Sequence, residues 1–414
     1  MGKTLNFEQN SGKFQSAHGL RSRKIRIISP NGLSDAGGVE RVMLYAYRAL
    51  SEHGFRVDII DQKDLSGSNI GRFFSFFKTG PLDFLAQSFG LSILANREHR
   101  SGSFIINNGY SAFFAKSDIL FCHRCIRGAR LAQYRVRSEQ QPSSLSERRA
   151  QIDGHKTSRI TRLIGSLKIF LYGPDEIAEM IAGHRSHIIL AVSEHSQREW
   201  QRYYRLSSSK FKNLPNSVDT EHFQPDLESH KQQSSRQSRI ALRILFIGSL
   251  TYLKGLDRLG ATIEKARQTA KNWEFIIATP SSFNTEKFAS KQNVTVREGV
   301  SFAELPDLYR SCDVMYFPSI YEGFEMVTLE ALSSGLPVVG TDVGAISVLY
   351  KAGFPGVYRI DPDDFDQISD AFEIAASRWK DPAEKRLLHN LVDANYGIST
   401  WSQKLIEILE AYHD

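Results

Sequence analysis

The chain of 414 residues is 41% hydrophobic and 24% charged, a composition that is typical of globular proteins and excludes a disordered or fibrous one. The chain is longer than a domain built around one hydrophobic core, and its length predicts two domains of about 150 to 200 residues each. The net charge of +6 is uneven: residues 1–225 hold 32 Lys and Arg against 20 Asp and Glu, and residues 226–414 hold 20 against 26. The basic first half indicates either a solvated surface or an anionic partner, namely a membrane surface or nucleic acid.

The first half of the chain has the pattern of a doubly wound α/β domain. After a polar tail over residues 1–22, the segment 24–29, with isoleucines at 25, 27 and 28, predicts a strand. Apolar residues at three- and four-residue spacing then predict a helix over 39–50. Further buried parallel strands are expected at 57–60, 104–106, 119–122 and 188–192. We therefore predict a Rossmann-like N-terminal domain over residues 23–224.

Polar segments divide the chain. Residues 138–160 are rich in Ser, Gln and Arg and predict an insertion, and residues 225–240 predict a linker. The α/β pattern then restarts, which predicts a C-terminal Rossmann-like domain over 241–395, with a closing helix in 396–414 that packs back on the N-terminal domain. The strands expected there lie at 244–248, 274–278, 294–296, 314–317 and 337–339.

The sequence predicts a cytoplasmic protein. No run approaches the roughly 18 apolar residues that a spanning helix needs, and the start lacks the apolar core of a signal peptide. Three cysteines are too few for a disulfide scaffold. Cys122-His-Arg-Cys125 has no second pair of ligands elsewhere, so we interpret it as a buried structural pair rather than a zinc or redox site.

Residues directly after the strands are the candidate site residues, because ligands of doubly wound domains bind beyond the carboxyl ends of the strands. Four such places stand out: Gly37-Gly38, His123, Ser249 to Lys254, and Glu322 to Glu330. In the last, a strand ends at Phe317 and a helix is expected to begin near Glu325. The free amides and partial positive charge of a helix N-terminus favour a phosphate.

The segment 318–339, Pro-Ser-Ile-Tyr-Glu-Gly-Phe-Glu-Met-Val-Thr-Leu-Glu followed by Ala-Leu-Ser-Ser-Gly-Leu-Pro-Val-Val, closely resembles the E-x7-E signature of retaining GT-B glycosyltransferases, family four of that classification. Further segments also resemble this family and follow one another in the same order as in the family; they lie at 36–41, 191–196, 214–219, 246–250 and 254–255. The resemblance implies an α/β GT-B fold, with two Rossmann-like doubly wound domains and an interdomain cleft. It also implies a retaining, metal-independent hexosyltransferase that moves a hexose from a nucleotide-sugar to a hydroxyl acceptor.

The same resemblance implies roles for individual residues. Glu322 would contact the transferred sugar, Glu330 the ribose, and Lys254 the diphosphate leaving group, whose charge a fixed cation stabilises. His123 would face the sugar as a catalytic residue; the alternative is a structural histidine. The remaining donor contacts would come from Gly37, Gly38, Ser249, Gly323, Phe324, Glu325, Met326 and Val327.

Some positions depart from the family pattern. Ser249 stands where the family has an arginine on the diphosphate, a role that Arg258 could take over, and Ser217 and Glu325 each replace a glycine. Glu325 at the start of the helix suits the helix dipole but is unfavourable beside phosphate. It could instead face the acceptor or a sugar hydroxyl.

Cofactors and partners follow from the same resemblance. The nucleotide-sugar is a substrate, and we expect no further cofactor and no metal. Asp361-Pro-Asp363 matches the metal-binding Asp-x-Asp of another transferase fold, but we interpret it as a surface loop. The basic N-terminal half suggests a glycan or glycolipid acceptor at the inner face of the cytoplasmic membrane, in cell-surface polysaccharide or lipopolysaccharide synthesis.

Two alternative functions remain. One is a GT-B sugar-nucleotide epimerase, which shares the two-domain plan. The other is a basic membrane- or nucleic-acid-binding module. We expect no nucleic-acid partner, because the chain carries no basic-aromatic RNA-binding motif and no helix-turn-helix signature.

Overall fold

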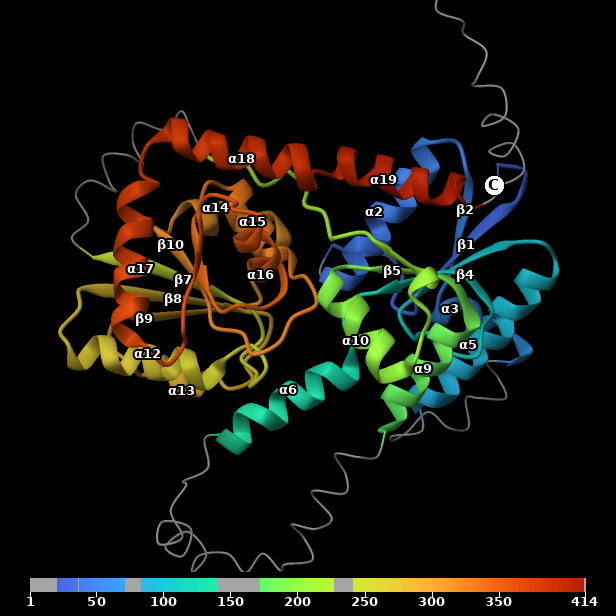
Figure 1. Cartoon of the computed structure of the whole chain (residues 1–414), viewed down its shortest axis with the longest axis horizontal. Helices are drawn as coiled ribbons and strands as arrows, with labels where there is room; N and C mark the ends of the chain where they lie inside the picture. Colours follow the sequence, from blue (N-terminus) through green and yellow to red (C-terminus); the bar gives the residue numbers. More distant parts are fainter. Residues whose placement is uncertain (1–20, 36, 71–82, 140–171, 227–240, 413–414) are drawn as a thin grey trace, which may run out of the picture. The chain divides into compact units, whose positions relative to one another are not determined.

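The chain folds into two compact units, and the computed structural model describes residues 21–35, 37–70, 83–139, 172–226 and 241–412 (Figure 1). Unit 1 draws its described residues from 1–123, 178–216 and 398–414, and unit 2 draws its own from 124–177 and 217–397. The tail (1–22), the insertion (138–160) and the linker (225–240) lie wholly or largely outside the described residues. Among the described helices, none is both long and apolar enough to cross a membrane.

Unit 1 contains a six-stranded sheet in which every pairing is parallel, with the order β2-β1-β3-β4-β5-β6. The order reverses between β1 and β3, so this pair flanks the switch point of the sheet. The strands are β1 Lys24–Ile28, β2 Arg56–Ile60, β3 Phe104–Asn108, β4 Ser117–Cys122, β5 Ser186–Ala191 and β6 Phe211–Asn213. The sequence predicted the first five and missed β6, a strand of three residues at the edge of the sheet.

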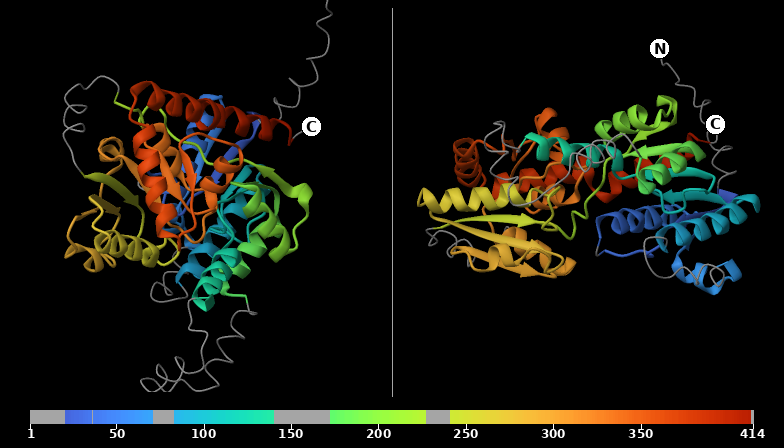
Figure 2. Two further views of the ribbon diagram at one scale, coloured as in Figure 1. Left: turned by 60° about the vertical axis from the view of Figure 1, so that its left-hand side comes forward. Right: turned by 90° about the horizontal axis from the view of Figure 1, so that it is seen from below.

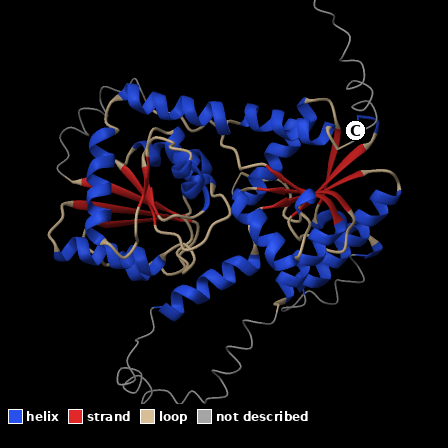
Figure 3. Cartoon of the chain, in the orientation of Figure 1, coloured by secondary structure: helices blue, strands red, loops and turns tan. Residues whose placement is uncertain are grey.

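Helices cover both faces of this sheet, as Figure 3 shows. The helices are α2 Gly38–Glu52, α3 Gln62–Gly67, α5 Asp83–Arg100, α9 Pro174–Arg185, α10 Glu194–Tyr204 and α19 Ile398–Glu410. Apolar side chains of α3 and α5, such as Leu65 and Leu91, form one core with Ile28, Ile60 and Ile105 of the strands. α19 packs against α2.

The end of the chain is fastened to unit 1 by aromatic contacts. The Trp401 ring lies 6.4 Å from that of Phe121, and the Tyr412 ring lies 5.6 Å from that of Phe104. The Tyr412 hydroxyl also donates a hydrogen bond of 3.3 Å to Asp118. Residues 398–412 are therefore part of the unit 1 core.

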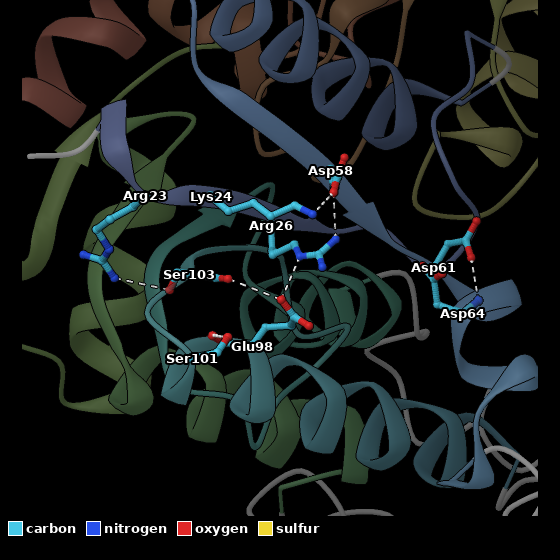
Figure 4. A network of polar contacts seen from close by, with 9 residues as sticks. All are labelled: Arg23, Lys24, Arg26, Asp58, Asp61, Asp64, Glu98, Ser101 and Ser103. Atoms are coloured by element: carbon cyan, nitrogen blue, oxygen red, sulfur yellow. Dashed lines mark hydrogen bonds and ion pairs between the residues drawn. The ribbon is translucent and has the colours of Figure 1, made fainter. Parts of the chain in front are cut away.

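A polar network fastens the edge strand β2 and its neighbour β1 to α5 (Figure 4). Asp58 of β2 forms ion pairs with Lys24 and Arg26 of β1. Arg26 also binds Glu98 of α5, with 2.9 Å between Nε and Oε2. The network is half-exposed, so each pair contributes about 1 kcal/mol or less. It joins Asp58 of β2 to the paired strand β1 and, through Arg26, to α5.

Unit 2 contains a second six-stranded parallel sheet, with the order β12-β11-β10-β7-β8-β9. The first strand of the unit, β7, lies between β8 and β10, which is the Rossmann order, with its switch point between β7 and β10. The strands are β7 Leu242–Ile247, β8 Trp273–Thr279, β9 Val294–Glu298, β10 Val314–Phe317, β11 Val338–Gly340 and β12 Val357–Arg359. The sequence missed β12, again an edge strand of three residues.

Figure 2 shows helices on both faces of this second sheet. The helices of unit 2 are α6 Ile126–Glu139, α12 Leu256–Gln268, α13 Glu286–Ala289, α14 Leu305–Arg310, α15 Met326–Ser333, α16 Gly344–Lys351, α17 Phe365–Arg378 and α18 Pro382–Tyr396. Leu259 of α12 and Phe372 of α17 share one core with the strands. α15 contacts α14, α16 and α18. Both units are therefore Rossmann-like α/β domains, as predicted.

Candidate active site

The switch point of unit 2 brings together two site residues that are far apart in sequence. Lys254 follows β7 and Glu322 follows β10, and these strands are neighbours in the sheet. The Lys254 Nζ lies 2.7 Å from Glu322 Oε1, and the Ser319 hydroxyl donates to the same oxygen over 3.0 Å. The Lys254 side chain is 32% exposed and that of Glu322 is 12% exposed. The ion pair is therefore partly shielded from water but still reachable.

Backbone contacts hold the two loops of this pair against each other. Gly255 has a φ of +79°, and a Cβ on it would lie 2.2 Å from the Pro318 carbonyl oxygen, so only glycine fits there. Arg258 Nη1 donates to the carbonyl oxygens of Pro318 and Ser319, each at 3.1 Å. Arg258, the proposed replacement for the missing diphosphate arginine, thus has this nitrogen engaged in holding the loop. Ser249, at the place of that arginine, is partly buried in the turn after β7.

The N-terminus of α15 supplies the expected backbone amides. The helix begins at Met326, and its N-cap residue Glu325 makes no side-chain capping bond. Gly323, Phe324 and Met326 are buried and Val327 is partly buried. The Phe324 ring packs 5.9 Å from the Tyr396 ring, which anchors this loop to α18. The loop is therefore held by packing and not by a cap.

Glu325 is buried and bonded within unit 2. Its Oε1 accepts a hydrogen bond of 2.6 Å from the Thr328 hydroxyl, and its Oε2 accepts one of 2.9 Å from the Ala345 amide. Burial, followed by the nearby charge of Glu322, raises the pKa of Glu325 to about 7. Both carboxylate oxygens are thus engaged with protein groups, although the residue was expected to contact the donor.

Glu330 is completely buried on α15, with 0% of its surface exposed. Its Oε2 accepts a hydrogen bond of 2.8 Å from the hydroxyl of Tyr309, a fully buried residue on α14. A carboxylate next to the core needs such partners. A ribose hydroxyl could reach Glu330 only after neighbouring groups move, so the ribose role stays a prediction.

Unit 1 holds the other expected residues. The His123 Nε2 lies 2.7 Å from Asn108 Oδ1, so the carboxyl ends of the neighbouring strands β3 and β4 orient this ring. Gly37 and Gly38 form the start of α2, where Gly37 is an N-cap without a side chain. The carboxylate of Glu40 folds over this end, since a Cβ on Gly37 would lie 2.3 Å from Glu40 Oε2.

The two segments with the spacing of metal-binding motifs differ in burial. Cys122 and Cys125 are buried thiols. Asp361 and Asp363 are exposed, and the Asp361 carboxylate accepts a hydrogen bond of 3.0 Å from the Asp363 amide, as in a surface turn. Within the described ranges, no group of three or more His, Cys, Asp or Glu is arranged to hold a metal ion.

Four residues of this site in unit 2 were not predicted. Tyr321 precedes Glu322, and its hydroxyl bonds to both the amide and the carbonyl of Cys125, each at 3.1 Å. Ser319, Tyr309 and Gly344 support Glu322, Glu330 and Glu325 respectively. For Ser319 and Tyr321, adjacency to Glu322 in the sequence was a usable signal. Tyr309 and Gly344 are brought to the site by the fold alone.

Comparison with known proteins gives matches in both sequence and fold. Residues 241–377 match the family model described as "Glycosyl transferases group 1". The uncharacterized glycosyltransferase MJ1607 of Methanocaldococcus jannaschii is 28% identical over 224 residues, which cover 50% of this chain and 57% of that protein. The lipopolysaccharide core biosynthesis mannosyltransferase LpsB of Rhizobium meliloti is 27% identical over 161 residues, covering 35% of this chain and 46% of that protein. The chain spans about half the length of the curated relatives it matches.

The fold likeness extends over both units. The crystal structure of Anabaena HepE in complex with UDP and glucose aligns with a TM-score of 0.62 at 15% identity, covering 94% of this chain and all of that one. At this identity the likeness concerns the fold, which is the two-domain GT-B arrangement. Residues 241–377, which lie within unit 2, therefore resemble the group 1 glycosyltransferases in sequence.

Proposed function

We propose that this chain is a retaining glycosyltransferase that moves a hexose from a nucleotide-sugar to a hydroxyl group of a glycan or glycolipid, without a metal ion. The observation that carries the proposal is the Lys254–Glu322 pair at the switch point of unit 2, in which Glu322 lies in the loop that leads to the N-terminus of α15. Departure of a nucleoside diphosphate builds negative charge. A lysine ammonium and the amides of a helix N-terminus are the groups that stabilise such charge.

The lysine and the glutamate have complementary roles in this proposal. Lys254 is held by Glu322 at 2.7 Å, so an arriving diphosphate shares or takes over this ammonium. Glu322 is then available to accept hydrogen bonds from hydroxyl groups of the sugar. The Ser319 hydroxyl, 3.0 Å from the same carboxylate oxygen, keeps that carboxylate in place during the exchange.

His123 supplies the polar group of unit 1. An amide oxygen only accepts hydrogen bonds, so the 2.7 Å contact with Asn108 Oδ1 places a hydrogen on Nε2 of the ring. A ring held in this way is suited to bind a sugar hydroxyl. We propose that it orients the transferred hexose.

Donor and acceptor are proposed from the relatives. HepE was crystallised with UDP and glucose, and LpsB is named as a mannosyltransferase of lipopolysaccharide core synthesis. We propose a hexose carried by a nucleoside diphosphate as donor, with UDP as the first nucleotide to test, and an acceptor that is a cell-surface polysaccharide or lipopolysaccharide precursor. The excess of Lys and Arg over residues 1–225 favours peripheral binding at the inner face of the cytoplasmic membrane. Sedimentation with anionic and neutral vesicles at low and high salt tests this membrane binding. Equal binding to anionic and neutral vesicles contradicts it.

A thermal shift screen of UDP-, GDP- and ADP-sugars tests the central proposal, because a ligand stabilises the fold in proportion to its affinity. We expect one nucleotide series to raise the melting temperature, also in the presence of EDTA. With that donor and a trial acceptor, NMR of the product should show retained anomeric configuration. Inversion would contradict the mechanism, and a sugar nucleotide epimerised without acceptor would favour the epimerase alternative.

A further inference from the structure

We propose that Glu325 is a positioning residue that holds Glu322 in place by tying the start of α16 to the start of α15. Its effect on sugar transfer rests on the proposed function. The tie consists of two hydrogen bonds, from the Thr328 hydroxyl in α15 and from the Ala345 amide in α16. Glu325 is only 8% exposed, so both bonds are shielded from competing water.

Gly344 connects these hydrogen bonds to Glu322, because its backbone lies against both glutamates. It has a φ of +55° and starts α16 directly before Ala345. A Cβ on Gly344 would lie 2.0 Å from Glu325 Oε2 and 2.6 Å from the Cβ of Glu322. The backbone of α16 therefore touches both glutamates, and its position limits where the side chain of Glu322 can begin.

The carboxylate of Glu322 is held on its other side by Lys254 Nζ at 2.7 Å and by the Ser319 hydroxyl at 3.0 Å. Its Cβ is thus confined by α16 while its carboxylate is confined by the loops after β7 and β10. If the tie to Glu325 is lost, α16 can shift and Glu322 gains freedom. The distance between Glu322 and Lys254 then changes without any substitution in that pair.

The charges around Glu325 agree with a positioning role. Glu322 is the charged neighbour that faces it, and Asp342, in the loop before α16, is paired with Arg359 instead. Burial raises the pKa of Glu325 to about 7, so the carboxyl is partly protonated at neutral pH. Either form can keep the tie, because a protonated carboxyl still accepts from Ala345 and can donate to the threonine oxygen.

Two variants of Glu325 differ in whether they keep these hydrogen bonds. In Glu325→Gln the amide oxygen can accept from Ala345 and the amide nitrogen can donate to Thr328, so the tie survives without a titrating group. In Glu325→Ala both bonds are lost. A residue that acts through geometry should tolerate glutamine and not alanine.

The test measures acylation of Lys254 in the full chain by a lysine-reactive ester, followed by peptide mass spectrometry. Lys271 is the internal reference, because it also pairs with a glutamate at 2.7 Å and is 31% exposed, close to the 32% of Lys254. We expect Glu325→Ala to raise the ratio of Lys254 to Lys271 labelling about twofold to fivefold, because a change of this size corresponds to the loss of one partly exposed ion pair. Glu325→Gln should restore the wild-type ratio.

Two outcomes would overturn the proposal: an unchanged ratio in Glu325→Ala, or an equal rise in both variants. If Glu325→Ala unfolds, both lysines react faster, and Thr328→Val, which removes one of the two bonds, takes its place with a smaller expected rise. The readout needs no donor. Failure of the proposed function appears separately, as a wild-type protein that no UDP-, GDP- or ADP-sugar stabilises against heat.

Discussion

The candidate residues of the two units differ in how they are held. In unit 2, Lys254, Glu322 and Glu325 belong to one chain of contacts that runs through Ser319, Gly344 and Ala345. In unit 1, His123 is oriented by the adjacent strand, and Gly37 and Gly38 present backbone alone. A change in unit 2 should therefore spread to other site residues. A change in unit 1 should stay local.

The largest expected effect comes from breaking the central pair. Lys254→Ala and Glu322→Ala should each lower kcat by about a hundredfold to a thousandfold, as expected for loss of a group that stabilises transition-state charge. Lys271→Ala is the matched control, since it removes a similarly exposed lysine from the ion pair with Glu373. Steady-state kinetics with the donor found by thermal shift measures the effect. An equal loss in the control would point to a general charge effect.

Double variants test which of these residues act together. The double variant of Lys254 and Glu322 should lose much less than the product of the single losses, because the two residues act as one network. His123→Ala combined with Lys254→Ala should be close to multiplicative in kcat/KM. Strong coupling between His123 and Lys254 would contradict the difference between the units.

The next effect concerns the loop that carries Lys254. Gly255→Ala forces a Cβ to within 2.2 Å of the Pro318 carbonyl at a φ of +79°, so we expect a loss of about 2 to 4 kcal/mol in the free energy of unfolding. Gly260→Ala is the control, because this glycine lies inside α12 with no atom within 4 Å of the added Cβ. It should stabilise the protein by about 0.5 to 1 kcal/mol. Urea unfolding measures both, and equal effects would refute the steric argument.

A pH series tests the environment of Glu325. Its pKa is about 7 in the folded chain, above the ordinary 4.5, so the folded state binds more protons than the unfolded state between these values. The free energy of unfolding should therefore fall as pH rises from about 4.5 to 7, and stay lower above that range. Glu325→Gln removes this loss, so its stability relative to wild type should rise by on the order of 2 kcal/mol from pH 5 to pH 8.

Glu264→Gln is the control for this series. Hydrogen bonds from Arg267 and Gln268 lower the pKa of the exposed Glu264 to about 2, so its linkage to stability runs in the opposite direction and at lower pH. Its stability difference from wild type should be nearly flat between pH 6 and pH 8. A flat difference for Glu325→Gln as well would show that burial does not perturb Glu325.

The smallest effect concerns Glu330. Tyr309→Phe removes the hydroxyl that donates to its buried carboxylate at 2.8 Å, and we expect a cost of about 1 to 3 kcal/mol. Tyr316→Phe removes a buried bond of 3.0 Å to the neutral hydroxyl of Thr262 and should cost about 1 kcal/mol. Thermal unfolding separates the two. If Glu330 binds ribose, Tyr309→Phe should also raise the KM for the donor with little change in kcat.

The fold was predictable where strands are long and apolar. The apolar runs 119–122 and 244–246, for example, are buried on both faces of their sheets and can be recognised in the sequence. The edge strands Phe211–Asn213 and Val357–Arg359 are too short for any periodicity, and their exposed residues resemble loops. Such strands form only by pairing with a neighbouring strand, and the sequence does not show which strand that is.

The candidate site was predictable as a set of positions but not as a set of contacts. Placement after β7 and β10 anticipated Lys254 and Glu322 because the strand order makes those ends adjacent. The burial of Glu330 behind Tyr309 and the tie from Glu325 to Ala345 depend on packing between α14, α15 and α16. No spacing along the chain encodes that packing.

The assignment of α19 to unit 1 has a consequence for synthesis of the protein. The rings of Phe104 and Phe121 are covered by Tyr412 and Trp401, which are translated after every residue of unit 2. Domains commonly fold in the order in which they emerge. Here unit 1 emerges first but stays incomplete until residues 398–414 are made, after every residue of unit 2. A nascent or prematurely terminated chain would thus expose an unfinished apolar surface on unit 1 and would be a natural client for chaperones.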